Sequence, residues 1–326
     1  MRFGLMIEAQ QGLSYSSQLA IAKRAEANGF EAFFRSDHYA SFPGPVGHPT
    51  TDAWSVLAGL ARETERIGLG VLVSPATFRL PGSFAKVVTT VDEMSGGRIE
   101  VGVGAGWNEV EHRQLGLPFP PIEERADWME DQLAVLHGLW GEPDGWSYDG
   151  HKVKVADALF HPKPVQVPGR PTTPIGLVRP RIIVGGGGSP RSTRIAARYA
   201  DEFNVTSSTP EKVAEVQTRI DAACAAIGRD PAEITRSAMI GVMVGRDEAQ
   251  VRERERALRA ALEVADAESE WLEERRTRWV LGTPDQARET VARFAAVGVE
   301  RIMLQDFLPH DLAMIDLLGE ELVSRV

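Results

Sequence analysis

Short apolar runs alternate with amphipathic stretches along the entire chain of 326 residues. Strands that alternate with helices form parallel βαβ units, and eight such units close naturally into a barrel. We therefore predict an α/β fold, a TIM (β/α)₈ barrel that spans residues 1–326 as a single domain; a doubly wound open sheet is the alternative. Eight runs have strand character, namely Phe3–Ile7, Glu31–Arg35, Gly68–Val73, Arg98–Val103, Arg181–Val184, Glu202–Val205, Thr235–Val244 and Arg301–Gln305.

The regular alternation is interrupted once, after the clearest helical stretch of the chain. Apolar residues recur at steps of three and four from Ile122 to Trp140, which defines one buried helix face. Residues 141–179 then carry many prolines and glycines and have no helical period. We predict an insertion between the fourth and fifth strands, with a short hairpin near Trp146–Lys154. A charged stretch over residues 248–278 is predicted to be a solvated helix.

Composition excludes several classes of function. The formal net charge is −10, and an acidic chain repels phosphate backbones and anionic lipid, so nucleic-acid and membrane partners are not expected. A single cysteine, Cys224, allows neither an internal disulfide nor a cysteine-cluster metal site. The seven histidines show no HxH or HxxxH spacing, and no GxSxG hydrolase elbow is present. We expect a cytoplasmic protein that acts on a small molecule without a metal.

The function of such a barrel is expected where its strands end and loops begin. Ser36-Asp37-His38 follows the second predicted strand. Asp37 is placed to accept a hydrogen bond from a cofactor hydroxyl, and His38 is a candidate catalytic residue that moves a proton near neutral pH.

Two further strand ends carry candidate residues. The third strand breaks at Ser-Pro and would present Leu72, Val73 and Ser74 to a flat ring. The fourth strand runs into a GxGxG pattern, where alternate glycines leave room for something bulky or simply allow tight barrel packing. Polar side chains follow this pattern, and Glu109 among them is the second candidate catalytic residue. The cofactor-binding candidates of this stretch are Gly104, Ala105 and Gly106.

A run of four glycines follows the fifth strand. Ser189 suits a helix N-cap and Pro190 the first helical position, so a helix begins directly after the glycines. Bare backbone N–H groups beside a helix N-terminus form a ready phosphate site. The residues predicted to bind a phosphate are Gly185, Gly186, Gly187 and Gly188.

Taken together, these segments resemble the luciferase-like superfamily of flavin and deazaflavin oxidoreductases. The resemblance rests on Ser36-Asp37-His38, on residues 95–112, on Gly185–Asp201 and on Gly282-Thr283-Pro284. It implies a barrel, often a homodimer, that holds a flavin-type ring in its mouth. In the branch that uses coenzyme F420, the resemblance assigns Asp37 to the cofactor and His38 to proton transfer.

The resemblance also implies roles for two other segments. A backbone bulge within Leu72, Val73 and Ser74, often with a non-prolyl cis peptide, would back the ring. The glycines at 185–188 would lie along the cofactor phosphate and tail. Hydride would pass between C5 of the deazaflavin and an organic substrate.

The sequence departs from the F420-dependent sugar-phosphate dehydrogenases at two places. Trp107 stands where they have a glutamate, and the uncharged residues 206–209 stand where they have a lysine. We therefore expect a substrate other than a sugar phosphate, and aromatic residues near the mouth favour a less polar one: Phe42, Trp107, Trp271 and Trp279. Two alternatives remain open, an FMNH₂-dependent flavin monooxygenase of the same superfamily and a cofactor-binding protein without catalysis.

Overall fold

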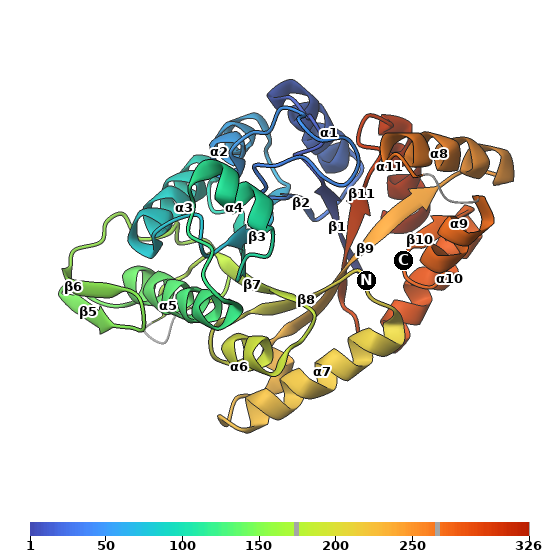
Figure 1. The fold of residues 1–326 in the computed structure, drawn as a ribbon. Coiled ribbons are helices and arrows are strands. Elements are labelled where there is room, and N and C mark those ends of the chain that lie inside the picture. The colour runs from blue at the N-terminus through green and yellow to red at the C-terminus, as the bar shows by residue number, and fades with distance from the viewer. Residues whose placement is uncertain (173–175, 265–267, 326) are drawn as a thin grey trace.

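The computed structural model describes residues 1–172, 176–264 and 268–325. Parallel strands form a closed barrel, because β8 pairs with β9 in addition to the open strand order β9-β11-β1-β2-β3-β4-β7-β8. Helices surround this ring of strands (Figure 1). The eight barrel strands are β1 (Arg2–Ile7), β2 (Ala32–Arg35), β3 (Gly68–Pro75), β4 (Ile99–Gly104), β7 (Arg181–Gly186), β8 (Glu202–Thr206), β9 (Thr235–Val244) and β11 (Arg301–Asp306). The TIM-barrel prediction is thus confirmed, and the open-sheet alternative is wrong.

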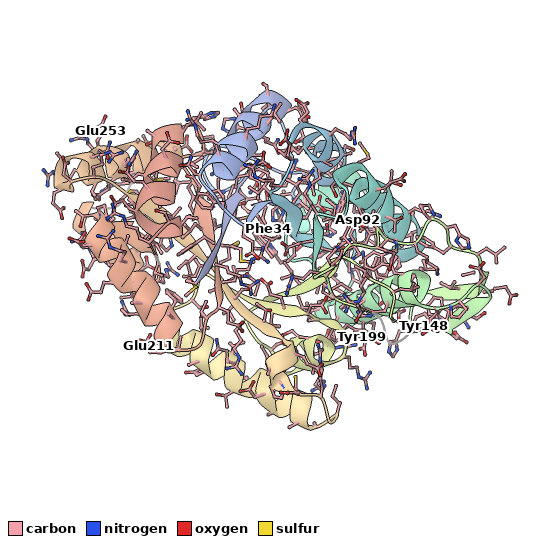
Figure 2. All side chains as sticks on the ribbon, turned by 180° about the vertical axis from the view of Figure 1, so that it is seen from behind. Phe34, Asp92, Tyr148, Tyr199, Glu211 and Glu253 are labelled. Carbon is pink, nitrogen blue, oxygen red and sulfur yellow. The ribbon has the colours of Figure 1, made fainter. Side chains whose placement is uncertain are left out.

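The barrel strands are buried on both faces, as parallel strands covered by helices usually are. Their inner face packs a compact group of apolar side chains, including Phe34, which lies fully buried within the ring of strands (Figure 2). Their outer face packs against the helices in one large cluster. The helices that follow the strands are α1 (Tyr15–Ala27), α2 (Ala53–Glu63), α3 (Pro81–Ser95), α5 (Ile122–Gly141), α6 (Pro190–Tyr199), α7 (Pro210–Ala225), α8 (Glu248–Ala261), α10 (Pro284–Ala296) and α11 (Leu312–Leu318).

Several short elements were not predicted from the sequence. Helix α4 (Glu109–Leu115) lies between β4 and α5, and strand β10 (Val280–Gly282) adds to the end of β9. Both are too short to show a recognisable period. The predicted charged helix over residues 248–278 is present as α8 and α9 (Glu268–Arg276), and residues 265–267 of that stretch lie outside the described residues.

The insertion before β7 contains the predicted hairpin. Strands β5 (Trp146–Asp149) and β6 (Lys154–Ala158) pair antiparallel, and Tyr148 and the backbone of the turn are held by the Asp131 carboxylate of α5. Residues 173–175 of the insertion are outside the description. Among the described residues, every helix is too short or too polar to cross a membrane.

Candidate active site

A cavity of about 760 Å³ opens at the carboxyl ends of the barrel strands. It is lined by residues at or just after the ends of β1, β2, β3, β4, β7, β8, β9 and β11, and by residues of α9 and the segment that follows it. Its volume lies within the range of about 300–1,000 Å³ typical of small-molecule sites. The barrel mouth is therefore the candidate active site.

His38 lies in the wall of this cavity, directly after β2. Its Nδ1 is 2.9 Å from Oε1 of Glu111, and the His38 side chain retains 15% of its exposed surface. The other carboxylate oxygen of Glu111 accepts hydrogen bonds from the backbone N–H groups of Tyr39 and Ala40. Glu111 thus holds both the imidazole and the loop that carries it. Because Nδ1 donates to Glu111, Nε2 is the nitrogen left for proton exchange with a ligand.

The structure separates two glutamates that lie close in the sequence. Both belong to α4, which begins after the N-cap Asn108. Glu109 is exposed and does not line the cavity, whereas Glu111 is buried against His38. Residues two apart on a helix face in different directions. The partner of His38 is therefore Glu111, and Glu109, the residue predicted from the sequence, lies away from it.

Asp37 is almost fully buried and does not line the cavity. Arg79 donates to both of its carboxylate oxygens, and Ser74 Oγ donates to Oδ2 at 2.8 Å. Arg79 also pairs with Asp52, the N-cap of α2. Burial by itself lowers the pKa of Arg79, but the charges of Asp37 and Asp52 outweigh it and hold this pKa above its usual value. Direct contact between Asp37 and a cofactor hydroxyl, as predicted, would require these protein partners to be exchanged.

The end of β3 contains the predicted bulge. The register between β3 and β4 shifts between Val71 and Ser74, and the Leu72–Val73 peptide is cis. Leu72 and Val73 line the cavity. Ser74 points the other way, where its buried Oγ also accepts a hydrogen bond from Trp54 Nε1 at 3.0 Å. Of the three residues predicted here, two therefore face the cavity and Ser74 supports Asp37 behind the wall.

The glycines of β4 and β7 make room for a side chain of the protein itself. A Cβ on Gly104 would lie 2.6 Å from Val73 Cγ2, and a Cβ on Gly185 would lie 2.9 Å from Val73 Cγ1. The bulky group that approaches these glycines is therefore Val73. This contact corresponds to the second interpretation of the GxGxG pattern, tight packing within the barrel. Ala105 and Gly106 follow directly and line the cavity.

The four glycines at the end of β7 and directly after it, Gly185–Gly188, are only partly open to the cavity. Gly185, Gly186 and Gly187 line it, and a Cβ on Gly186 or Gly187 would meet no atom within 4 Å. Gly188 instead packs against α7, where a Cβ would lie 2.5 Å from Val216. The Ser189 side chain caps α6 as predicted, by accepting from the backbone N–H of Ser192.

Aromatic and cationic side chains surround the mouth. The rings of Phe42 and Trp107 pack edge-on against His38, with centroids 4.5 and 5.7 Å away, and Trp107 is 64% exposed. Arg275 and Arg278 line the cavity beside Trp279. Trp271 is buried under the Arg275 guanidinium rather than at the cavity surface.

Sequence reasoning missed several cavity residues that carry no motif of their own. They include the two arginines of the mouth and three polar residues at strand ends, Glu8, Asn204 and Gln305. The three polar residues lie within or just after predicted strands, and this position was the available signal for them.

Several known proteins resemble this chain over nearly its whole length. An F420-dependent glucose-6-phosphate dehydrogenase of Microbacterium testaceum is 28% identical over 100% of this chain and 97% of its own length. An FMNH₂-dependent dimethylsulfone monooxygenase of Pseudomonas putida is 25% identical, over 94% of this chain and 86% of its own. The solved structure of an F420-dependent secondary alcohol dehydrogenase with an F420-acetone adduct superposes with a TM-score of 0.80 at 19% identity, covering 98% of both chains. Residues 1–301 match the family described as luciferase-like monooxygenase, and the chain belongs to this family.

Proposed function

We propose that this protein is an F420-dependent oxidoreductase that transfers hydride between the deazaflavin and a small organic substrate other than a sugar phosphate. The observation that carries the proposal is His38, a titratable side chain in the cavity wall whose Nδ1 is held by the buried Glu111. An imidazole oriented in this way is suited to the proton transfer that accompanies hydride transfer. F420-dependent relatives support the choice of cofactor.

The cavity suits a flavin-type ring with a phosphate-bearing tail. Leu72 and Val73 would back the ring, and the open backbone at Gly186 and Gly187, next to the N-terminus of α6, would hold the phosphate. A buried acceptor atom in the wall, Asn204 Oδ1, has no hydrogen-bond partner among the described residues. When bound, the deazaflavin supplies a carbon, C5, that exchanges hydride with the substrate.

The chain's own residues would provide orientation and proton transfer. Glu111 fixes the tautomer of His38, so that Nε2 accepts a proton from a substrate hydroxyl or returns one to a carbonyl. Asp37 acts as a positioning residue in this scheme, because its bonds to Arg79 and Ser74 tie the His38 loop to the end of β3. The rings of Phe42 and Trp107 restrict water around the imidazole.

Part of the positive charge at the cavity mouth is offset within the protein, which favours a substrate without a phosphate. Arg275 and Arg278 are the cations of the cavity wall, and both contact the Glu274 carboxylate, at 3.3 and 2.7 Å. That carboxylate offsets part of their positive charge. Thr206 and Ser207, on the other side, add only hydroxyl groups.

Titration of the purified protein with F420 and with FMN, followed by fluorescence, tests the cofactor. We expect tight binding of F420 and turnover with a secondary alcohol but not with glucose 6-phosphate. Tight binding of FMN alone would overturn the proposal and favour the monooxygenase alternative, which the dimethylsulfone monooxygenase relative supports. Cofactor binding without turnover across a broad substrate panel would favour the non-catalytic alternative.

We also propose that the protein is a homodimer, as the family resemblance implies. Light scattering of the purified protein is expected to give twice the chain mass of 35.6 kDa. A mass equal to that of one chain would contradict this proposal.

A further inference from the structure

Three polar side chains line the cavity on or directly after strands that are not direct neighbours of β3, and each carries a side-chain oxygen. Glu8, which follows β1, Asn204 of β8 and Gln305 of β11 all line the cavity. The strand order places β8, β11 and β1 away from the Leu72–Val73 bulge of β3. We call these three residues the acceptor wall, because each carries a side-chain oxygen acceptor and the amide nitrogens of Asn204 and Gln305 already donate within the protein.

Asn204 is the clearest member. Its Nδ2 donates to Ser237 Oγ at 2.9 Å and lies 3.4 Å from Met303 Sδ, an atom that only accepts. The Ser237 hydroxyl itself donates to the carbonyl of Phe203, so it must accept from Asn204. These contacts fix the orientation of the amide. Oδ1 is therefore the atom without a partner among the described residues, in a side chain that is only 1% exposed.

Glu8 and Gln305 form the rest of the wall. Gln305 Nε2 donates to Glu8 Oε1, and Gln10 Nε2 donates to Glu8 Oε2 at 2.7 Å. Gln10 is fixed in turn, because its Oε1 accepts from Ser36 Oγ. One N–H of the Gln305 amide is thus paired with Glu8, and Gln305 Oε1 is an acceptor. Glu8 makes no ion pair with any residue that the structure describes, although it is only 6% exposed.

A buried acceptor without a donor costs free energy, and this cost is recovered when a ligand supplies the donor. We propose that the acceptor wall recognises O–H or N–H groups of the bound ligand, so that the cavity selects a donor-bearing molecule. A ligand that offers only acceptors, such as an ether or an ester, would leave the wall unsatisfied. The inference rests on the proposed function for the identity of the ligands, a ring with an imide N–H and a hydroxylated substrate.

The test replaces the partnerless amide and compares it with a matched control. Asn204→Leu removes Oδ1 from the wall and keeps the branched shape and the number of side-chain heavy atoms. Gln217→Leu removes another buried amide with a partnerless atom, on α7 and outside this cavity. Losing one neutral hydrogen bond should weaken ligand binding about three- to tenfold for Asn204→Leu and leave binding unchanged for Gln217→Leu.

Two sets of measurements distinguish the source of the donor. If the ring supplies it, Asn204→Leu raises the Kd for F420 or FMN, and the difference from the unaltered protein disappears with N3-methylated FMN. If the substrate supplies it, the cofactor Kd is unchanged and the KM for a secondary alcohol rises more than kcat falls. Equal affinities and KM values for Asn204→Leu and the unaltered protein would overturn the proposal.

Thermal unfolding of the ligand-free protein gives a readout that does not need a cofactor. Asn204→Leu also loses the Nδ2–Ser237 hydrogen bond, but an amide kept for binding adds little else to the ligand-free state, so its melting temperature should fall by no more than that of Gln217→Leu. A drop larger than that of Gln217→Leu would show a structural amide and overturn the inference. Failure of the unaltered protein to bind F420 or FMN would instead defeat the proposed function, and the melting temperatures would still decide this inference.

Discussion

At the scale of single residues, the neighbours of a side chain decide its chemistry. His38 and Asp37 are adjacent in the chain, yet His38 lines the cavity and Asp37 lies behind it in an ion pair with Arg79. The two carboxylates also differ in purpose, since Glu111 orients the imidazole whereas Asp37 joins two loops. The proposed chemistry therefore depends on His38 and Glu111 together.

Replacement of His38 should separate catalysis from binding. General acid–base catalysis contributes about 10²–10⁴-fold, so His38→Ala should lower kcat by a factor in this range. The Kd for F420 should change little, because the proposed ring and phosphate contacts come from other strands. Steady-state kinetics and fluorescence titration measure the two quantities. An unchanged kcat would remove His38 from the mechanism.

The two glutamates of α4 provide a second comparison. Glu111→Gln weakens the charge that orients His38 and should lower kcat about tenfold or more, with a shifted pH profile. Glu109→Gln, an exposed change on the same helix, should leave both kcat and the pH profile as they are. The reverse result would restore Glu109 as the catalytic carboxylate.

One buried carboxyl group should make stability depend on pH. Burial, reinforced by the charge of Asp311, raises the pKa of Asp306 from 3.8 to about 7, against the hydrogen bond from Leu308 and the charge of Arg254. A carboxyl with a raised pKa in the folded state stabilises fully below its unfolded value, and this contribution is lost as pH rises through about 7. Melting temperatures should therefore fall between about pH 4 and pH 7 by more in the unaltered protein than in Asp306→Asn. Equal slopes would exclude Asp306 as the source.

At the scale of elements, the end of β3 shapes the cavity together with β4 and β7. The bulge places Val73 over two glycines, one from β4 and one from β7. This packing forms the wall that would back a ring. Gly102 of β4 also lies against β3: a Cβ there would lie 2.2 Å from the Val71 carbonyl oxygen and 3.0 Å from Val73 Cγ1.

A double substitution tests this packing. Gly104→Ala should lower the free energy of unfolding by about 1–3 kcal/mol, the usual cost of overpacking. Val73→Ala in the same chain should recover most of that loss, because the methyl group that clashes is gone. Gly187→Ala is the control and should be neutral, since a Cβ there meets no atom. Denaturant unfolding of the unaltered protein, of Gly104→Ala and Val73→Ala alone and of the double variant measures the coupling, and simple additivity would contradict the assigned contact.

At the scale of the whole molecule, a buried ion network helps close the barrel. Arg301 of β11 is fully buried and contacts Glu100 of β4 at 2.6 Å, Glu202 of β8 at 3.0 Å and Glu31 before β2 at 3.0 Å. The charges of Glu100 and Glu202 outweigh the effect of burial and raise the pKa of Arg301. Four parts of the barrel thus meet at one guanidinium, at the end opposite the cavity.

Removing this cation should destabilise the entire barrel. Among the described residues, Arg301→Leu leaves Glu100 and the buried Glu202 with only the longer ion-pair contacts to Arg181, at 4.0 and 3.9 Å, and should cost about 3–5 kcal/mol of unfolding free energy. Arg246→Leu breaks an exposed pair with Glu320 and should change it by no more than about 1 kcal/mol. Urea unfolding followed by circular dichroism compares them. Similar values for both variants would show that the network adds no more than a surface pair does.

The sequence by itself determined the barrel fold and placed the candidate active site at the carboxyl ends of its strands. All eight barrel strands lie where the apolar runs predict them, because strand and helix periods are local properties of the chain. Local signals also placed His38, the end of β3 and the glycines 185–187 at strand ends that face the cavity, whereas the bulge in β3 was implied by the family resemblance.

Only the tertiary structure decided which side chains meet there. In the folded protein, Glu111 rather than Glu109 contacts His38. Ser74 and Asp37 lie behind the cavity wall, and the glycines of β4 pack against Val73. The tertiary structure also brought Glu8 and Gln305, nearly 300 positions apart, into one hydrogen bond. A local pattern indicates that a residue ends a strand, but its partners come from strands that become neighbours only when the barrel closes.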